Sequence, residues 1–346
     1  MKKAAVIGHF ANGLSYSDGQ TVKTKTLTQS LCDHYGAEEV LKVDTHGWSR
    51  NALEFVGKIR KAAVQAENLI MMPAQNGLKI IAPLLYLARH RCAIHYVVVG
   101  GWLPELIKGR RALKRILQKF DGIYVETQTM KRNLEDQGFA NVMVMPNCKV
   151  LQPLSEDTLV YTHAEPYKLC TFSRVMKEKG IGDAVDAVQA VNTRLGRRVY
   201  ELDIFGPVDP GQKEWFASLQ KRFPDYIRYG GGVPFDQSVE TLKAYYALLF
   251  PTRFYTEGVP GTILDAYAAG IPVIAARWES YADIVSEATG IGYPFDQPKA
   301  LENILLSLAE APAGLNGKKA ACLRRFREYT PDSVINILLS GLDTSG

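Results

Sequence analysis

The sequence predicts an α/β protein of two domains, each built around a parallel β-sheet. Short apolar runs that end in glycine, proline or a polar residue alternate with longer stretches of helical periodicity. This alternation is interrupted once, near the middle of the chain, and then resumes. The length of 346 residues agrees with two domains, because one domain averages roughly 150 residues.

The strands follow from the apolar runs. In the first half they are expected at residues 4–8, 40–44, 69–72, 94–100, 122–126 and 142–145. In the second half they are expected at residues 167–172, 200–205, 227–229, 247–250 and 272–275, with helices at, for example, 182–195 and 214–222. Pro146 and Pro153 frame a stretch without periodicity, so we place the domain boundary near residue 150.

Composition excludes several classes of protein. A hydrophobic fraction of 47% and a charged fraction of 22% are typical of globular chains. No apolar run reaches the roughly 18 residues that a membrane span needs, and residues 4–8 are too short for a signal peptide. The five cysteines are scattered without a Cys-x-x-Cys pair, which favours neither disulfides nor a zinc site. We therefore expect a cytoplasmic protein.

Positive charge is concentrated in the first half. Residues 1–150 carry 21 basic and 12 acidic side chains, whereas the remainder carries 20 and 24. Residues 108–120 combine Arg110, Arg111, Lys114 and Arg115 with apolar residues at helical spacing, which predicts a basic amphipathic helix. Such a helix can lie on an anionic membrane, or it can pack on the core with a solvated basic face. No nucleic-acid-binding motif is present, and no nucleic-acid partner is expected.

The first strand leads into a glycine-rich turn. Gly8 and Gly13 have the spacing of a phosphate-binding P-loop, but Leu14 stands where the lysine is required, and no Gly-x-Gly-x-x-Gly follows. A P-loop NTPase and a dinucleotide-dependent dehydrogenase are both disfavoured. The loop at residues 15–23 leads into a helix whose first amides would attract an anion, the alternative being an ordinary surface loop.

Two segments of the second half carry residues suited to a nucleotide diphosphate. Ser173, Arg174 and Lys179 follow the first strand, and the two cations suit a diphosphate. Residues 250–274 read as a strand, a glycine-rich loop, a helix and a further strand, with Glu257 in the loop and Asp265 in the helix. Eight helical residues span up to roughly 12 Å, so one carboxylate could bind sugar hydroxyls and the other ribose. The alternative is purely structural, with Glu257 capping the helix and Asp265 packing at its surface.

The chain resembles the retaining glycosyltransferases of family 4, which have the GT-B architecture of two Rossmann-like parallel-sheet domains facing a central cleft. The resemblance rests on Arg174, Lys179-Gly180, the strand ending at Gly206 and the segment from Glu257 to Asp265. It implies an acceptor-binding domain at 1–150, a nucleotide-sugar-binding domain at 151–327, and a helix at 328–346 that returns to the first domain.

The resemblance also implies roles for individual residues. Glu257 would contact the donor sugar, Asp265 the ribose, and Arg174 and Lys179 the diphosphate. The further donor-binding residues implied are Gly19, Ser173, Gly206, Gly258, Val259, Gly261, Thr262 and Asp265. Members that build bacterial capsule or exopolysaccharide are similar around Gly19 to Lys23 and Val99 to Glu105, which makes Lys23 and Trp102 acceptor or membrane candidates together with Arg110, Arg111, Lys114 and Arg115.

Three positions depart from the family pattern. Asp265 replaces a glutamate and keeps the acceptor chemistry, Pro260 lacks a backbone N–H that could contact the donor, and His95 lies inside a strand rather than after it. We expect His95 to be a core residue.

The reaction implied moves a sugar from a UDP- or GDP-sugar to a glycan, with a lipid-diphosphate-linked acceptor at the inner face of the cell membrane. No Asp-x-Asp motif or metal-ligand spacing is present, so we expect neither a metal nor a cofactor. The alternatives are a nucleotide-sugar epimerase of the same fold and a non-catalytic nucleotide-sugar-binding subunit.

Overall fold

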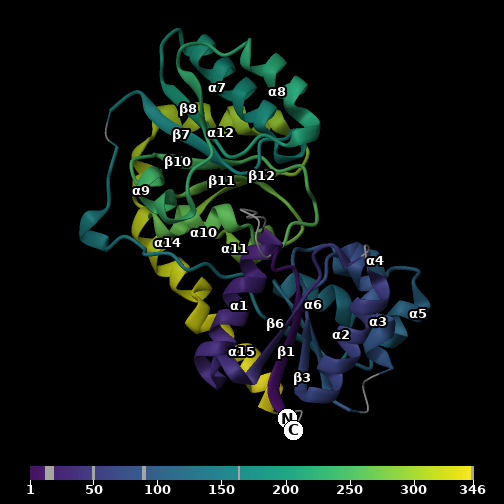
Figure 1. Cartoon of the computed structure of the whole chain (residues 1–346). Helices are drawn as coiled ribbons and strands as arrows, with labels where there is room; N and C mark the ends of the chain where they lie inside the picture. The colour runs from purple at the N-terminus through teal and green to yellow at the C-terminus, as the bar shows by residue number, and fades with distance from the viewer. Residues whose placement is uncertain (12–18, 49–50, 88–90, 163, 344–346) are drawn as a thin grey trace. The chain divides into compact units, whose positions relative to one another are not determined.

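The computed structural model describes residues 1–11, 19–48, 51–87, 91–162 and 164–343. The chain divides into two compact units, one formed by Met1–Val150 with Tyr329–Gly346 and one formed by Leu151–Glu328 (Figure 1). Each unit has a six-stranded sheet in which every pairing is parallel, which confirms the predicted α/β class. Gly13, Leu14 and residues 15–18 of the glycine-rich turn lie outside the described residues.

The first unit has the strand order β2-β1-β3-β4-β5-β6. Its strands are β1 (Lys2–Gly8), β2 (Val40–Asp44), β3 (Ala66–Met71), β4 (Ala93–Val97), β5 (Gly122–Val125) and β6 (Val142–Val144). The central strands are buried on both faces, as in other parallel sheets that helices cover on both sides.

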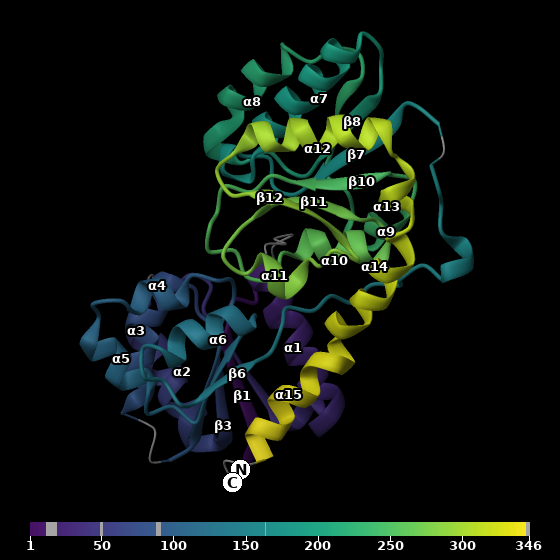
Figure 2. The ribbon, with the colours of Figure 1, turned by 180° about the vertical axis from the view of Figure 1, so that it is seen from behind.

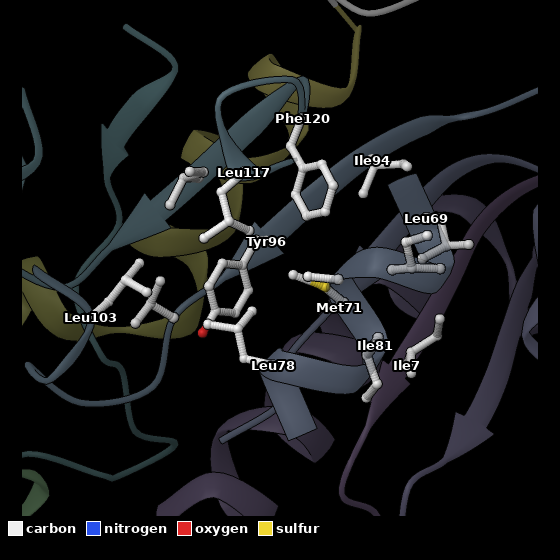
Figure 3. Close-up of a cluster of buried hydrophobic side chains, with 14 of the residues drawn as sticks. Ile7, Leu69, Met71, Leu78, Ile81, Ile94, Tyr96, Leu103, Leu117 and Phe120 are labelled. Carbon is white, nitrogen blue, oxygen red and sulfur yellow. The ribbon is translucent and has the colours of Figure 1, made fainter. Parts of the chain in front are cut away.

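Helices cover both faces of this sheet. One face packs against α2 (Ala52–Gln65), α3 (Gln75–Tyr86), α4 (Leu103–Ile107), α5 (Arg111–Leu117) and α6 (Gln128–Glu135). Figure 3 shows this core, with Leu78 and Ile81 of α3 near Ile7, Met71 and Tyr96 of the strands. The other face packs against α1 (Gly19–Tyr35) and α15 (Pro331–Asp343), so the C-terminal helix is part of the first unit's core (Figure 2).

The second unit has the strand order β12-β11-β10-β7-β8-β9. Its strands are β7 (Tyr167–Phe172), β8 (Tyr200–Phe205), β9 (Ile227–Gly231), β10 (Ala247–Phe250), β11 (Val273–Arg277) and β12 (Gly290–Pro294). One face of the sheet is covered by α7 (Ile181–Leu195), α8 (Lys213–Gln220) and α12 (Pro298–Glu310). On the other face, α10 (Gly261–Ala268) packs against α9 (Ser238–Leu242) and α14 (Lys319–Phe326), as Figures 1 and 2 both show. The short helices α11 (Tyr281–Ile284) and α13 (Ala313–Asn316) complete the unit.

One expected element was wrong, and one strand was not expected. The basic helix expected at residues 108–120 is α5 alone, because the backbone at Gly109 has a φ of +74° and separates α5 from α4. Its apolar residues Leu113, Leu117 and Phe120 are buried in the core. The strand β12 was missed, because its five residues include two glycines and a proline and lack a clear apolar run.

Candidate active site

The candidate site lies at the carboxyl ends of the central strands of the second unit. β7 pairs with β8 on one side and β10 on the other, so the chain order reverses direction at β7. Ligands of doubly wound sheets bind outside the strand ends at such a reversal. The segments that leave β7, β8 and β10 carry Arg174, Gly206 and Glu257.

Two glycines allow these segments to approach closely. Gly180 has a φ of +69°, and a Cβ there would collide with the backbone carbonyl of Pro251. Gly206 has a φ of +128°, and a Cβ there would collide with the carbonyl of Ser173. Any other residue would therefore push apart the strand exits that form the site.

An ion pair occupies the centre of the site. The Lys179 ammonium donates to Glu257 Oε1, and the two side chains are 19% and 16% exposed. The buried Thr252 hydroxyl donates to the same carboxylate oxygen over 3.0 Å, which holds the glutamate in place. Lys179 Nζ also lies 5.0 Å from the ring centre of Phe254 and 5.7 Å from that of Phe250. Sequence reasoning missed Thr252, although a polar residue just after a strand end was a usable signal.

Arg174 provides a second cation at this edge. Its guanidinium lies 3.7 Å from a carboxylate oxygen of Asp209, and its side chain is 47% exposed. An exposed pair at this distance contributes at most about 1 kcal/mol to stability, so the arginine can turn to another anion at little cost. Ser173, beside it, is half-buried.

Two helices begin next to these residues. Neither α7 nor α10 has a side chain that caps its first turn among the described residues. Uncapped first-turn amides and the helix dipole favour a bound anion. The loop before α10 packs inward through Gly258 and Val259, which are buried, whereas Gly261 and Thr262 are half-buried at the start of the helix.

Asp265 is less accessible than a ribose-binding carboxylate would be. Its side chain is 1% exposed within α10. The ribose role of Asp265 stays a prediction.

Lys23 of the first unit is buried rather than presented to a ligand. Its ammonium donates to Glu126 Oε1 over 2.7 Å and to the Val98 carbonyl over 3.0 Å, and both charged side chains are 3% exposed. Glu126 Oε1 also accepts from the Gly100 amide over 3.1 Å. Direct contact of Lys23 with an acceptor or membrane, as expected from the sequence, does not fit this burial, and the pair instead orders the ends of β4 and β5.

The remaining candidates of the first unit differ in exposure. Trp102 is half-buried and donates from Nε1 to the Val99 carbonyl over 2.7 Å. Gly19 is exposed, and a Cβ there would meet nothing within 4 Å, so its described surroundings do not require glycine. The exposed basic residues are Arg110, Arg111 and Arg115, with Lys114 half-buried.

Histidines of the first unit have two different environments. His95 is fully buried between Asn68 and Tyr124, and burial lowers its pKa to about 4, which confirms it as a core residue. His9, after β1, lies 2.8 Å from Thr21 Oγ1 through Nδ1 and 3.2 Å from His46 Nδ1 through Nε2. This histidine pair was not foreseen, because its members are 37 residues apart in the sequence.

No grouping in the described part of the chain resembles a metal centre, since no three His, Cys, Asp or Glu side chains come together as ligands would. The chemistry available at the second unit's sheet edge is therefore that of two cations, one positioned carboxylate and two helix N-termini. This combination suits an anion joined to a polyhydroxylated group.

Part of the chain is similar to known glycosyltransferases. Residues 166–311 match the family model described as glycosyl transferases group 1. The amylovoran biosynthesis glycosyltransferase AmsK of Erwinia amylovora is 23% identical over 154 residues, which are 43% of this chain. The match spans only 37% of that relative's length.

Solved structures resemble the whole chain. HepE of Anabaena, in complex with UDP and glucose, has a TM-score of 0.76 at 13% identity, with 99% of this chain and 100% of that chain covered. Sucrose-phosphate synthase of Thermosynechococcus elongatus also has a TM-score of 0.76 at 13% identity, with both chains fully covered. At this identity the likeness concerns the fold. The chain therefore has the GT-B fold of two parallel-sheet units, and residues 166–311 of its second unit form the segment that matches the group 1 family model.

Proposed function

We propose that the chain is a retaining glycosyltransferase of the family 4 type that binds a nucleotide-sugar at the strand ends of the second unit and transfers the sugar to a glycan held by the first. The observation that carries this proposal is the Lys179–Glu257 pair between the exits of β7 and β10. The lysine is a cation suited to the diphosphate of a donor, and the glutamate is a carboxylate suited to its sugar hydroxyls. The two side chains are in contact, so a single nucleotide-sugar could reach both.

Donor binding exchanges this internal pair for contacts with the ligand. Lys179 turns from Glu257 to the diphosphate, and the released carboxylate accepts hydrogen bonds from the sugar. Thr252 keeps Glu257 oriented during the exchange, because its hydroxyl approaches from the buried side. Arg174 and the N-terminus of α7 add positive potential where the leaving group gains charge.

The reaction breaks the bond between the anomeric carbon and the diphosphate oxygen and forms one from that carbon to an acceptor hydroxyl oxygen. In the retaining mechanism, the acceptor attacks from the face of the leaving group, and the departing phosphate oxygen takes the hydroxyl proton. No protein nucleophile is needed. Arg174 and Lys179 balance the growing negative charge, so we expect metal-independent transfer.

A UDP-sugar is the first donor to test, because HepE has a similar fold and was solved with UDP and glucose. The similarity to an amylovoran biosynthesis enzyme supports exopolysaccharide or capsule synthesis. The excess of basic side chains in residues 1–150 favours an anionic acceptor, and a lipid-linked oligosaccharide diphosphate fits this charge.

Calorimetric titration with UDP-, GDP-, ADP- and TDP-sugars, without added metal, tests the donor assignment. We expect one class to bind, and Arg174→Ala and Glu257→Gln to weaken binding at least tenfold, since each removes a charge-assisted hydrogen bond. Arg194→Ala is the matched control, because this arginine lies at the other end of α7 in an exposed pair 3.9 Å from Glu302.

The outcomes separate the candidate functions. If no nucleotide-sugar binds the folded protein, the donor site is wrong. If a donor binds but is neither transferred nor hydrolysed with any glycan, a non-catalytic binding subunit is favoured. If the sugar is converted to its epimer without an acceptor, the chain is an epimerase.

A further inference from the structure

Two neighbouring aromatic side chains are exposed in the loop that carries Glu257. Tyr255 is 52% exposed and Phe254 is 38% exposed, although the loop leaves a strand, β10, that is buried throughout. Single exposed apolar side chains need no explanation, whereas adjacent ones mark a surface that contacts something else. These two precede the glutamate of the candidate site by only two and three positions.

Phe295, which directly follows β12, adds a third ring. The ring centres of Tyr255 and Phe295 are 5.1 Å apart and their planes are inclined by 71°, which is the favourable edge-to-face arrangement. Phe295 is half-buried, and Asp296 after it turns the chain with a φ of +60°. Two loops thus build one surface, and we call Phe254, Tyr255 and Phe295 the aromatic surface.

The loop that presents Tyr255 is anchored on both sides. The Arg253 amide donates to the Glu178 carbonyl over 2.8 Å, and the Arg253 guanidinium donates to the two carboxylate oxygens of Asp183 over 2.7 and 2.9 Å. Beyond β11, the Glu279 amide donates to the Tyr255 carbonyl over 3.0 Å. A ligand that binds the aromatic surface therefore has little backbone to order, which favours affinity.

The aromatic surface continues the candidate site along the same sheet edge. Lys179 Nζ, which contacts Glu257, lies 5.0 Å from the ring centre of Phe254. The strands β10, β11 and β12 are neighbours in the sheet, so β10 and β12 are two strand spacings, or roughly 10 Å, apart (Figure 2). A ligand that extends from Lys179 past Glu257 in this direction reaches Tyr255 next.

We infer that the aromatic surface stacks against the pyranose ring of the donor sugar, with Tyr255 as the ring that touches it and Phe295 as the support behind Tyr255. A pyranose presents C–H groups on its faces and hydroxyls around its rim. The face of an aromatic ring is apolar and slightly negative, which suits those C–H groups, while Glu257 accepts from the hydroxyls. The nucleobase is joined to the opposite end of the diphosphate, so it does not lie beside Glu257 when the sugar does.

This inference rests on the proposed function and adds to it a contact that recognises the sugar alone. Calorimetry tests it with the nucleotide-sugar that binds in the screen above and with the nucleoside diphosphate of the same base, for example UDP-glucose and UDP. We expect Tyr255→Leu, which keeps an apolar side chain but removes the ring, to weaken nucleotide-sugar binding about fivefold. Affinity for the nucleoside diphosphate should not change. Tyr255→Phe should bind both ligands as the natural chain does.

Two further variants give the test its specificity. Tyr161 is 46% exposed and precedes β7, toward the opposite ends of the strands from the candidate site, so Tyr161→Leu should leave both affinities unchanged. Phe295→Leu should cause a smaller loss than Tyr255→Leu, and combining the two should add little, because Phe295 acts through Tyr255. Binding of the nucleoside diphosphate reports on the folding of every variant.

Several results would overturn the inference and leave the proposed function intact. Equal weakening of both ligands in Tyr255→Leu would place the nucleotide on the rings instead of the sugar. Unchanged nucleotide-sugar affinity in that variant would exclude a donor contact, and loss of transfer at unchanged affinity would assign the rings to the acceptor. A loss in Tyr255→Phe as large as in Tyr255→Leu would show that the hydroxyl acts and the ring does not. If the natural chain binds no nucleotide-sugar, the proposed function is refuted and this inference with it.

Discussion

Gly180 offers a direct test of how closely the segments of the candidate site approach one another. The residue precedes α7 in the left-handed region, with a φ of +69°. Substitution by alanine costs about 1 kcal/mol for this backbone conformation. The added Cβ also collides with the Pro251 carbonyl, and moving a packed backbone to relieve such overpacking costs about 1–3 kcal/mol more. We expect Gly180→Ala to lower the free energy of unfolding by about 3 kcal/mol.

The other end of the same helix supplies the control. Gly196 has a φ of +64°, and a Cβ there would meet nothing within 4 Å. Gly196→Ala should therefore cost only the conformational part, about 1 kcal/mol. Urea unfolding followed by circular dichroism measures both values, and titration with the donor measures the site. Equal destabilisation of the two variants, with donor affinity unchanged in both, would refute the close-approach argument.

Three further predictions concern buried polar groups. Lys23→Met should lower the free energy of unfolding by about 3–5 kcal/mol in urea unfolding, because its carboxylate partner Glu126 stays buried. Lys3→Met, at an exposed ion pair, should lower it by at most about 1 kcal/mol, and similar values for the two variants would contradict the role of burial. Burial lowers the pKa of His95 from 6.5 to about 4, so the unfolded chain binds more protons between these values and stability should fall by roughly 3 kcal/mol as the pH drops from 6.5 to 4. In His95→Gln, the denaturation midpoint should lose this part of its pH dependence. An unaltered pH profile would exclude His95 as its source. Thr252→Val removes the hydroxyl that orients Glu257, so it should weaken donor binding about tenfold in calorimetry and leave the free energy of unfolding almost unchanged. Unchanged donor affinity would show that the hydroxyl is dispensable.

Strand positions were readable wherever an apolar run was continuous. The strands at 167–172, 200–205 and 247–250 were predicted with the observed bounds, because each is a compact run that ends at a polar residue, a glycine or a proline, namely Ser173, Gly206 and Pro251. β12 was not foreseen, since Gly290 and Gly292 interrupt its apolar pattern. The basic segment at 108–120 has the right apolar spacing, but spacing alone did not reveal that Gly109 ends one helix before the next begins.

The candidate site, too, was predictable from the sequence only in part. The residue types of Arg174, Lys179 and Glu257 and their positions after strands were local signals, and these were sufficient to propose diphosphate and sugar contacts. The contact between Lys179 and Glu257 was not readable, because 78 residues separate them. The burial of Asp265 was equally hidden, since it depends on the elements that α10 packs against.

The sequence by itself determined the α/β class and the two-domain organisation, and it predicted a chemistry for the second half, because periodicity, proline breaks and charged residues after strands are local properties of the chain. Only the tertiary structure decided which charges meet and which are exposed. It paired Lys23 with Glu126 inside the first unit, and it placed Tyr255 against Phe295 of a different loop in the second. Burial and pairing depend on residues far apart in the chain, and a sequence does not state which of them become neighbours.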